Sequence, residues 1–257
     1  EELQQMYDYR LGRIRSAMAQ YNIALAVLTS PVNMRYAVNF DEYQLFQSHI
    51  PTAVLFVPLE GPVTLFGASQ RHYPNVDDYG KSYFATPFDG GLDLRPHCQK
   101  LVRDIERFVA EYADGDKSAR IALERISPLV SQELVCKDYR LIDGEALVES
   151  AKLIKSATEL KCIRHSIAVA EYGIGLMYQE LRPGLTENQL WSVMHQVNIA
   201  HDGSWIEGKM LASGPRTNPW LQEASHRIIE AGDMVAFDTD MVGPMGYLAD
   251  ISRSWIC

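Results

Sequence analysis

Apolar residues follow two different spacings along the first 145 residues of this chain. They recur every three or four positions, which predicts helices, over residues 3–21, 101–112 and 131–136. Short continuous apolar runs, typical of buried strands, cover residues 23–29, 52–57, 63–66, 120–123 and 141–143. Residues 70–95 are polar and rich in turn residues, with the clearest break at Gly90 and Gly91. Helices that alternate with short apolar strands predict an α/β domain over residues 1–145.

The pattern changes after residue 145. Residues 156–159 have the sequence of a helix capping box and precede apolar residues at helical spacing, which end at Pro183 and Gly184. A second capping box at residues 186–189 begins another predicted helix, which ends near Gly203. Two helices followed by strands and a hairpin predict an α+β domain over residues 146–257.

Three aspartates lie on the predicted hairpin, in which two apolar runs flank a turn rich in glycine and proline. Asp238 and Asp240 are two positions apart, so in a strand they point to the same face, and Asp250 on the returning strand could face them. Strands are depleted in aspartate, and converging carboxylates repel one another unless a cation lies between them. Oxygen ligands suit Mg, Ca or Mn, and added imidazole would extend the choice to Fe or Zn. Aspartates near turns also cap loops or face water, so that alternative stays open.

A second group of candidate residues lies in a polar, proline-interrupted loop that begins near residue 210. Arg216 is a candidate for binding an anionic group of a substrate, and Trp220 is a candidate for an apolar or cation–π wall. The alternative is that Trp220 belongs to the core and that Arg216 is an ordinary surface charge. Loops carry function more often than cores do, which favours the site role.

Composition excludes several classes of function. The net charge is −9, from 24 basic and 33 acidic residues, and no basic patch with interleaved aromatics predicts a nucleic-acid partner. The apolar runs are too short to span a bilayer, and no signal peptide is visible. The four cysteines lack CxxC spacing, which favours a reducing cytoplasm over a disulfide framework or a zinc ribbon. The seven histidines form no HExxH or HxH pattern, and no GxSxG or P-loop sequence is present.

The hairpin and the loop together resemble a known family. Asp238-Thr-Asp240, Gly246-Tyr247 and residues 249–253 (Ala-Asp-Ile-Ser-Arg) resemble the metal-binding hairpin of the creatinase, prolidase and aminopeptidase P enzymes, the M24 or pita-bread family. Residues 212–215 (Ala-Ser-Gly-Pro) and residues 31–36 (Pro-Val-Asn-Met-Arg-Tyr) resemble other segments of that family. The resemblance covers the whole chain. It implies a creatinase-like α/β N-terminal domain, an α+β pita-bread catalytic domain and a homodimer.

The resemblance also implies a metal site and a small-molecule substrate that carries a carboxylate. Asp238, Asp240 and Asp250 would be ligands of a divalent metal: Fe, Mn, Zn or Co. Trp220 and Arg216 would lie near the substrate. The family's other ligands, a His and two Glu, and its catalytic base would lie beyond Cys257. The chain is therefore expected to hold the first half of the catalytic domain, as the N-terminal portion of a longer protein, and to bind metal weakly by itself.

Two features depart from the peptidases of this family. The peptidases carry two hairpin aspartates eleven positions apart in an Asp-x-Gly setting, whereas here Thr239 separates Asp238 from Asp240. They also carry a substrate-binding His where this chain has Trp220 after Pro219. Both features resemble the dimethylsulfoniopropionate lyases of the family, which implies cleavage of this substrate to dimethyl sulfide and acrylate. The alternatives are an Xaa-Pro dipeptidase or aminopeptidase and a non-catalytic binding module of the same fold.

Overall fold

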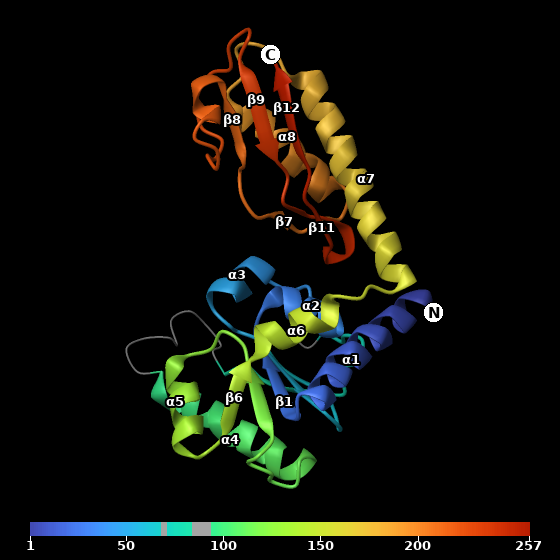
Figure 1. Ribbon diagram of the computed structural model, residues 1–257, viewed down its shortest axis with the longest axis vertical. Coiled ribbons are helices and arrows are strands. Elements are labelled where there is room, and N and C mark those ends of the chain that lie inside the picture. Colours follow the sequence, from blue (N-terminus) through green and yellow to red (C-terminus); the bar gives the residue numbers. More distant parts are fainter. Residues whose placement is uncertain (68–70, 84–93) are drawn as a thin grey trace. The chain divides into compact units, whose positions relative to one another are not determined.

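A computed structural model of the protein describes residues 1–67, 71–83 and 94–257, so the predicted break at Gly90 and Gly91 lies outside the described residues. The chain forms two compact units, Glu1–Ser156 and Ala157–Cys257 (Figure 1). The division comes later than the predicted boundary at residue 145, because helix α6 (Gly144–Lys152) packs against helix α1 (Glu2–Gln20) of the first unit. None of the described helices is long and apolar enough to cross a membrane.

A six-stranded mixed sheet with the order β4-β3-β2-β1-β5-β6 forms the centre of the first unit. Its strands are β1 (Ile23–Leu28), β2 (Val54–Pro58), β3 (Thr64–Gly67), β4 (Asp78–Lys81), β5 (Arg120–Leu123) and β6 (Arg140–Asp143). Strand β1 pairs antiparallel with β2 and parallel with β5. Five of these strands follow the apolar runs of the sequence. The sequence pattern missed β4, because its residues are polar and mostly exposed at the edge of the sheet.

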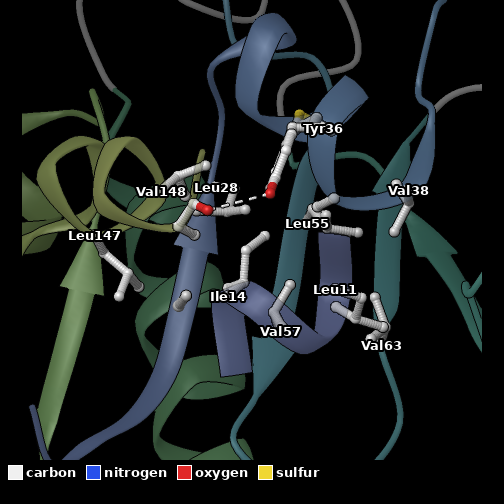
Figure 2. Packing of buried hydrophobic residues seen from close by; sticks show 14 of the residues in the cluster. Leu11, Ile14, Leu28, Tyr36, Val38, Leu55, Val57, Val63, Leu147 and Val148 are labelled. Carbon is white, nitrogen blue, oxygen red and sulfur yellow. Dashed lines mark hydrogen bonds between the residues drawn. The ribbon is translucent and has the colours of Figure 1, made fainter. Parts of the chain in front are cut away.

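Helices cover both faces of this sheet, which explains why β1 is apolar without interruption. Ala26 and Leu28 face a core shared with α1, α2 and α6, whereas Leu25 and Val27 face a core shared with α4 and α5. The remaining helix bounds are α2 (Pro31–Val38), α3 (Gln44–His49), α4 (Arg95–Tyr112) and α5 (Pro128–Cys136). In the first core the Tyr36 hydroxyl donates a hydrogen bond of 3.3 Å to the carbonyl of Ala151 (Figure 2).

The second unit consists of two packed helices and two three-stranded sheets, with the orders β11-β10-β7 and β12-β9-β8. The elements are α7 (Ala157–Glu180), α8 (Glu187–Ala200), β7 (Trp205–Ile206), β8 (Leu211–Ser213), β9 (Met234–Asp238), β10 (Met241–Val242), β11 (Leu248–Ala249) and β12 (Ser252–Ile256). The predicted capping box at the start of α8 is present: the Gln189 amide donates to Thr186 Oγ1, and the Thr186 amide donates to Gln189 Oε1. Trp191 of α8 and Phe237 of β9 lie in the single core between helices and sheets.

Candidate metal centre

The three candidate aspartates lie where the chain passes from one sheet of the second unit to the other. Asp238 ends β9 and pairs with Ser252 at the start of β12. Three residues further on, Met241 of β10 pairs with Ala249 of β11. The predicted hairpin is therefore present, but its two limbs are shared between two sheets, and the aspartates lie at the junction.

The junction brings the three carboxylates together. One oxygen each from Asp238, Asp240 and Asp250 lies within 4.8 Å of the others. The reasoning from strand periodicity was wrong in one detail: Asp240 lies beyond the end of β9 and has a φ of 38°, in the left-handed region. A turn, and not a shared strand face, therefore aims the Asp240 carboxylate toward Asp238.

The electrostatics of the group fit a cation. Hydrogen bonding with Asp238, together with the charge of Asp238, raises the pKa of Asp250. Burial, followed by the charge of Asp238, raises the pKa of Asp240. Oxygen Oδ1 of Asp238 is buried and has no hydrogen-bond partner. A divalent ion would satisfy this oxygen and remove the repulsion, and three carboxylates are a suitable donor set for such an ion.

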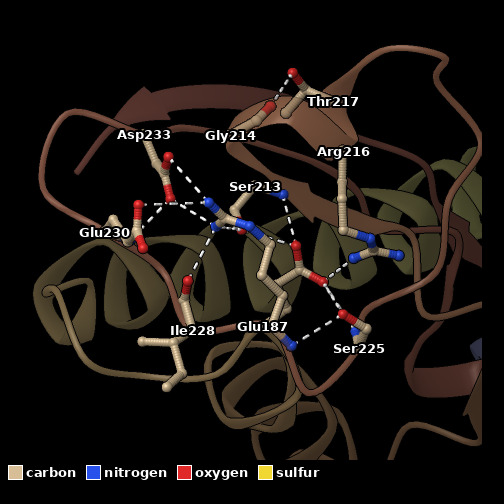
Figure 3. Close-up of polar contacts among 10 residues, drawn as sticks. Glu187, Ser213, Gly214, Arg216, Thr217, Ser225, Ile228, Glu230 and Asp233 are labelled. Atoms are coloured by element: carbon tan, nitrogen blue, oxygen red, sulfur yellow. Dashed lines mark hydrogen bonds and ion pairs between the residues drawn. The ribbon is translucent and has the colours of Figure 1, made fainter.

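In the part of the chain that the structure describes, the ion pair and hydrogen bonds of Arg216 go to Glu187 and Glu223, and to none of the three aspartates. Arg216 lies in the 3-10 turn η1 (Gly214–Thr217), which follows β8. Ser213 of β8 pairs with Val235, so η1 begins near the end of β9 opposite Asp238. The Arg216 guanidinium forms an ion pair with Glu187 (Figure 3). It also donates a 2.9 Å hydrogen bond to the carbonyl of Glu223. These contacts hold the loop in place, and a role of Arg216 in binding substrate stays a prediction.

Trp220 lies on the returning limb of the same loop and has 39% of its surface exposed. This limb reaches Glu223, which forms an antiparallel bridge with Met210. The Met210 carbonyl in turn accepts a 2.9 Å hydrogen bond from the amide of Asp238. Glu223 therefore lies beside the end of β9 that carries Asp238. Trp220 precedes Glu223 by three residues, which is roughly 10 Å of extended chain.

Glu187 was not found by sequence reasoning, although it organises this part of the unit. It is fully buried at the start of α8, and its carboxylate accepts five hydrogen bonds: from the amide and hydroxyl of Ser213, the amide and hydroxyl of Ser225, and the Arg216 guanidinium (Figure 3). Burial acts to raise the pKa of Glu187, but these hydrogen bonds outweigh it, and the pKa lies below its ordinary value. In the sequence, an acid in the first turn of a helix indicates only a favourable contact with the helix dipole.

A second ion pair adjoins Glu187. The Arg227 guanidinium donates a 2.6 Å hydrogen bond to Asp233 and one of 2.7 Å to the Ser213 hydroxyl (Figure 3). The hydrogen bond from Arg227 lowers the pKa of Asp233. Gly214 has a φ of 52°, and a Cβ atom there would overlap the Asp233 carboxylate, so this position requires glycine. The glycine of the Ser-Gly-Pro sequence thus has a structural reason.

Comparison with known proteins tests the family resemblance of this chain. Residues 161–257 match the model of metallopeptidase family M24. The chain is 30% identical, over 99% of its length, to the dimethylsulfoniopropionate lyase DddP of Roseovarius nubinhibens. The resemblance to the creatinase, prolidase and aminopeptidase P family that the sequence indicates is therefore confirmed.

Solved structures show the same fold. An Xaa-Pro dipeptidase from Bacillus anthracis matches 97% of this chain with a TM-score of 0.71 and 20% identity, and a prolidase from Thermococcus sibiricus matches 97% with a TM-score of 0.72 and 18% identity. This chain covers 65% of each of those two structures. It spans 59% of the length of the Roseovarius lyase. This chain thus has part of the pita-bread fold that those structures share.

Proposed function

We propose that this protein is a metal-dependent enzyme and that Asp238, Asp240 and Asp250 bind its divalent metal ion. The observation that carries the proposal is the convergence of the three carboxylates within 4.8 Å, around a buried Asp238 oxygen that lacks a hydrogen-bond partner. Carboxylates as close as these are stable together when a cation shares their charge. Fe, Mn, Zn and Co are the candidate ions, and the three oxygen donors do not select among them.

We further propose that the reaction is the cleavage of dimethylsulfoniopropionate to dimethyl sulfide and acrylate. The support is the 30% identity to the dimethylsulfoniopropionate lyase of Roseovarius nubinhibens, together with Thr239 and Trp220 at the positions where the motifs depart from the peptidases. In this β-elimination a base takes the proton α to the carboxylate, and the carbon–sulfur electron pair leaves with the sulfur. A bound metal would supply a positive charge that stabilises the negative charge developing on the substrate.

The residues of this chain would bind and orient the substrate. The indole of Trp220 would form a wall for the sulfonium cation, because aromatic faces attract cations. Arg216 and Glu187 would hold the loop that carries Trp220. Arg216 pairs with Glu187 and donates a hydrogen bond to the carbonyl of Glu223, so it joins the two limbs of the loop on either side of Trp220. The substrate carboxylate would lie beside the metal ligands Asp238, Asp240 and Asp250.

A peptidase is the second candidate function, because the solved structures with this fold include Xaa-Pro dipeptidases and prolidases. A peptidase would place a peptide carbonyl, in place of a sulfonium carboxylate, beside the metal. A non-catalytic binding module is the third candidate. It has no need of three clustered carboxylates with a buried oxygen that lacks a partner.

The test measures metal and product on the same sample. The purified full-length protein that contains this chain is analysed for bound metals by elemental analysis and assayed for dimethyl sulfide by gas chromatography and for hydrolysis of proline dipeptides. Metal with dimethyl sulfide release is the expected result, and Asp238→Ala is expected to lose both. Metal with dipeptide hydrolysis alone would overturn the lyase proposal in favour of the peptidase. Absence of metal would overturn the metal site and favour the binding module.

A further inference from the structure

Thr239 stands between two of the proposed metal ligands and is itself fully buried. A buried threonine must satisfy its hydroxyl, because an unpaired hydroxyl in the interior is costly. The sequence motif marks this position as unusual, since threonine occupies it in an Asp-Thr-Asp run. The contacts of this side chain therefore indicate what the position does.

The hydroxyl of Thr239 bridges the two peptide groups on either side of Asp250. Oxygen Oγ1 donates a 2.7 Å hydrogen bond to the carbonyl of Ala249 and accepts a 2.9 Å hydrogen bond from the amide of Ile251. The Thr239 amide also donates to the Ile251 carbonyl at 3.2 Å. One residue thus fixes the backbone both before and after Asp250.

These bonds lie where the regular strand pairing stops. The ladder of β9 and β12 ends at the pair Asp238 and Ser252, and the ladder of β10 and β11 ends at the pair Met241 and Ala249. Between these pairs the chain turns from one sheet to the other, with Asp240 in the left-handed region. Between the two ladders, the limbs are joined by the main-chain hydrogen bond from the Thr239 amide to the Ile251 carbonyl and by the two hydrogen bonds of the Thr239 hydroxyl.

The three carboxylates need such a restraint. Like charges within 4.8 Å push one another apart, and Asp250 is the most exposed of the three. Without the Thr239 hydroxyl, the main-chain hydrogen bond from the Thr239 amide to the Ile251 carbonyl is the bond that remains between the two ladders beside Asp250. Metal ligands are generally held by a surrounding shell of hydrogen bonds, and loss of such a bond typically weakens metal affinity 10- to 100-fold.

We propose that Thr239 is a positioning residue of the metal centre, and that its hydroxyl holds Asp250 in reach of an ion shared with Asp238 and Asp240. The inference rests on the proposed metal site and deepens it. It assigns a structural reason for threonine in the Asp-Thr-Asp run. It also predicts that the oxygen of this side chain matters, and that its methyl group does not.

The experiment measures the Mn²⁺ affinity of the purified full-length protein that contains this chain, from the loss of the electron paramagnetic resonance signal of free Mn²⁺ on binding. Thr239→Val keeps the shape of the side chain and removes the hydroxyl, so its Kd is expected to rise at least tenfold. Thr239→Ser keeps the hydroxyl, so its Kd is expected to stay within threefold of the wild type. Thr186→Ala is the matched control, because it removes the capping hydroxyl of α8 in the same unit, away from the aspartates.

The outcomes separate this inference from the proposed function. If the wild type does not bind Mn²⁺ or any other divalent ion, the metal site itself fails. If the wild type binds and Thr239→Val binds equally well, the role of Thr239 is refuted while the metal site stands. An equal loss in Thr186→Ala and Thr239→Val would also refute it, because general destabilisation would then be the cause. Should Thr239→Val not fold, Thr239→Ala against Thr239→Ser compares proteins that differ at this position by one oxygen atom.

Discussion

The buried carboxylate of Glu187 offers the sharpest test of how the second unit is held together. Glu187→Gln keeps the shape of the side chain but removes its charge and turns one acceptor oxygen into a donor. The two serine hydroxyls can rotate to accept from the new amide group, whereas the backbone amides of Ser213 and Ser225 cannot. At least one buried amide then loses its acceptor, and Arg216 loses its counter-charge.

The magnitude follows from these losses. A buried donor without a partner costs about 1–3 kcal/mol, and breaking a buried ion pair costs about 3–5 kcal/mol. Arg216 keeps 27% of its side chain exposed, so the lower end applies, and we expect a loss of about 3 kcal/mol in the free energy of unfolding. That is a large share of the roughly 5–15 kcal/mol that stabilises a typical domain.

Urea-induced unfolding, followed by tryptophan fluorescence, measures the free energy of unfolding of the second unit of the chain. All four tryptophans, Trp191, Trp205, Trp220 and Trp255, lie in the second unit. With a urea dependence of about 1–1.5 kcal/mol per molar for a unit of this size, the midpoint is expected to fall by roughly 2 M.

Glu180→Gln is the matched control, since it makes the same replacement in an exposed ion pair with Arg182. Both partners of that pair are more than half exposed, so we expect a change of less than about 1 kcal/mol. Equal shifts for the two variants would refute the reasoning, because the network around Glu187 would then contribute no more than a surface pair.

Three further predictions concern the metal centre and its surroundings. Asp238→Asn is expected to lower bound metal at least tenfold, measured by elemental analysis, and to leave the metal-free protein equally stable or about 0.5–1 kcal/mol more stable in thermal melts, because a repelling charge is gone. The folded-state pKa values of Glu187 and Asp233 lie below their ordinary values of 4.5 and 3.8. The stability that these two carboxylates contribute is therefore fully present above their ordinary pKa values and is lost as the pH falls through their folded-state pKa values. The urea concentration at the unfolding midpoint is expected to decrease when the pH is lowered below about 4.5, and to decrease less steeply in Glu187→Gln. Trp220→Ala is expected to raise the KM for dimethylsulfoniopropionate about tenfold, as a lost cation–π contact of about 1–2 kcal/mol implies, with unchanged metal content; an unchanged KM would remove Trp220 from the site.

Local pattern was sufficient for most elements of this fold. Apolar spacing predicted α1 and five strands of the first sheet, and the Thr186 capping box marked the start of α8. These features depend on residues close together in the sequence, so neighbouring residues specify them. Strand β4 and helices α2, α3 and α6 escaped prediction. The residues of β4 are polar and exposed at a sheet edge, and α6 is short and follows directly after β6.

The aspartate group is an intermediate case. Its three members lie within thirteen consecutive residues of one hairpin, so the sequence was enough to predict that they converge. The way they converge was decided by the fold, because the passage between two sheets and the left-handed backbone of Asp240 replace the simple strand expected from alternation. The hydroxyl of Thr239, which holds the two limbs together at this passage, could not be foreseen from spacing alone.

The Glu187 network depended entirely on tertiary structure. Its partners Ser213, Arg216 and Ser225 lie 26 to 38 positions away, and no periodicity links them to the first turn of α8. The sequence by itself determined where helices and strands form and which aspartates gather, because those depend on neighbouring side chains. Only the packing of β8, its loop and α8 decided that Arg216 meets Glu187 instead of solvent, because a buried carboxylate takes its partners from whichever donors the fold brings to it.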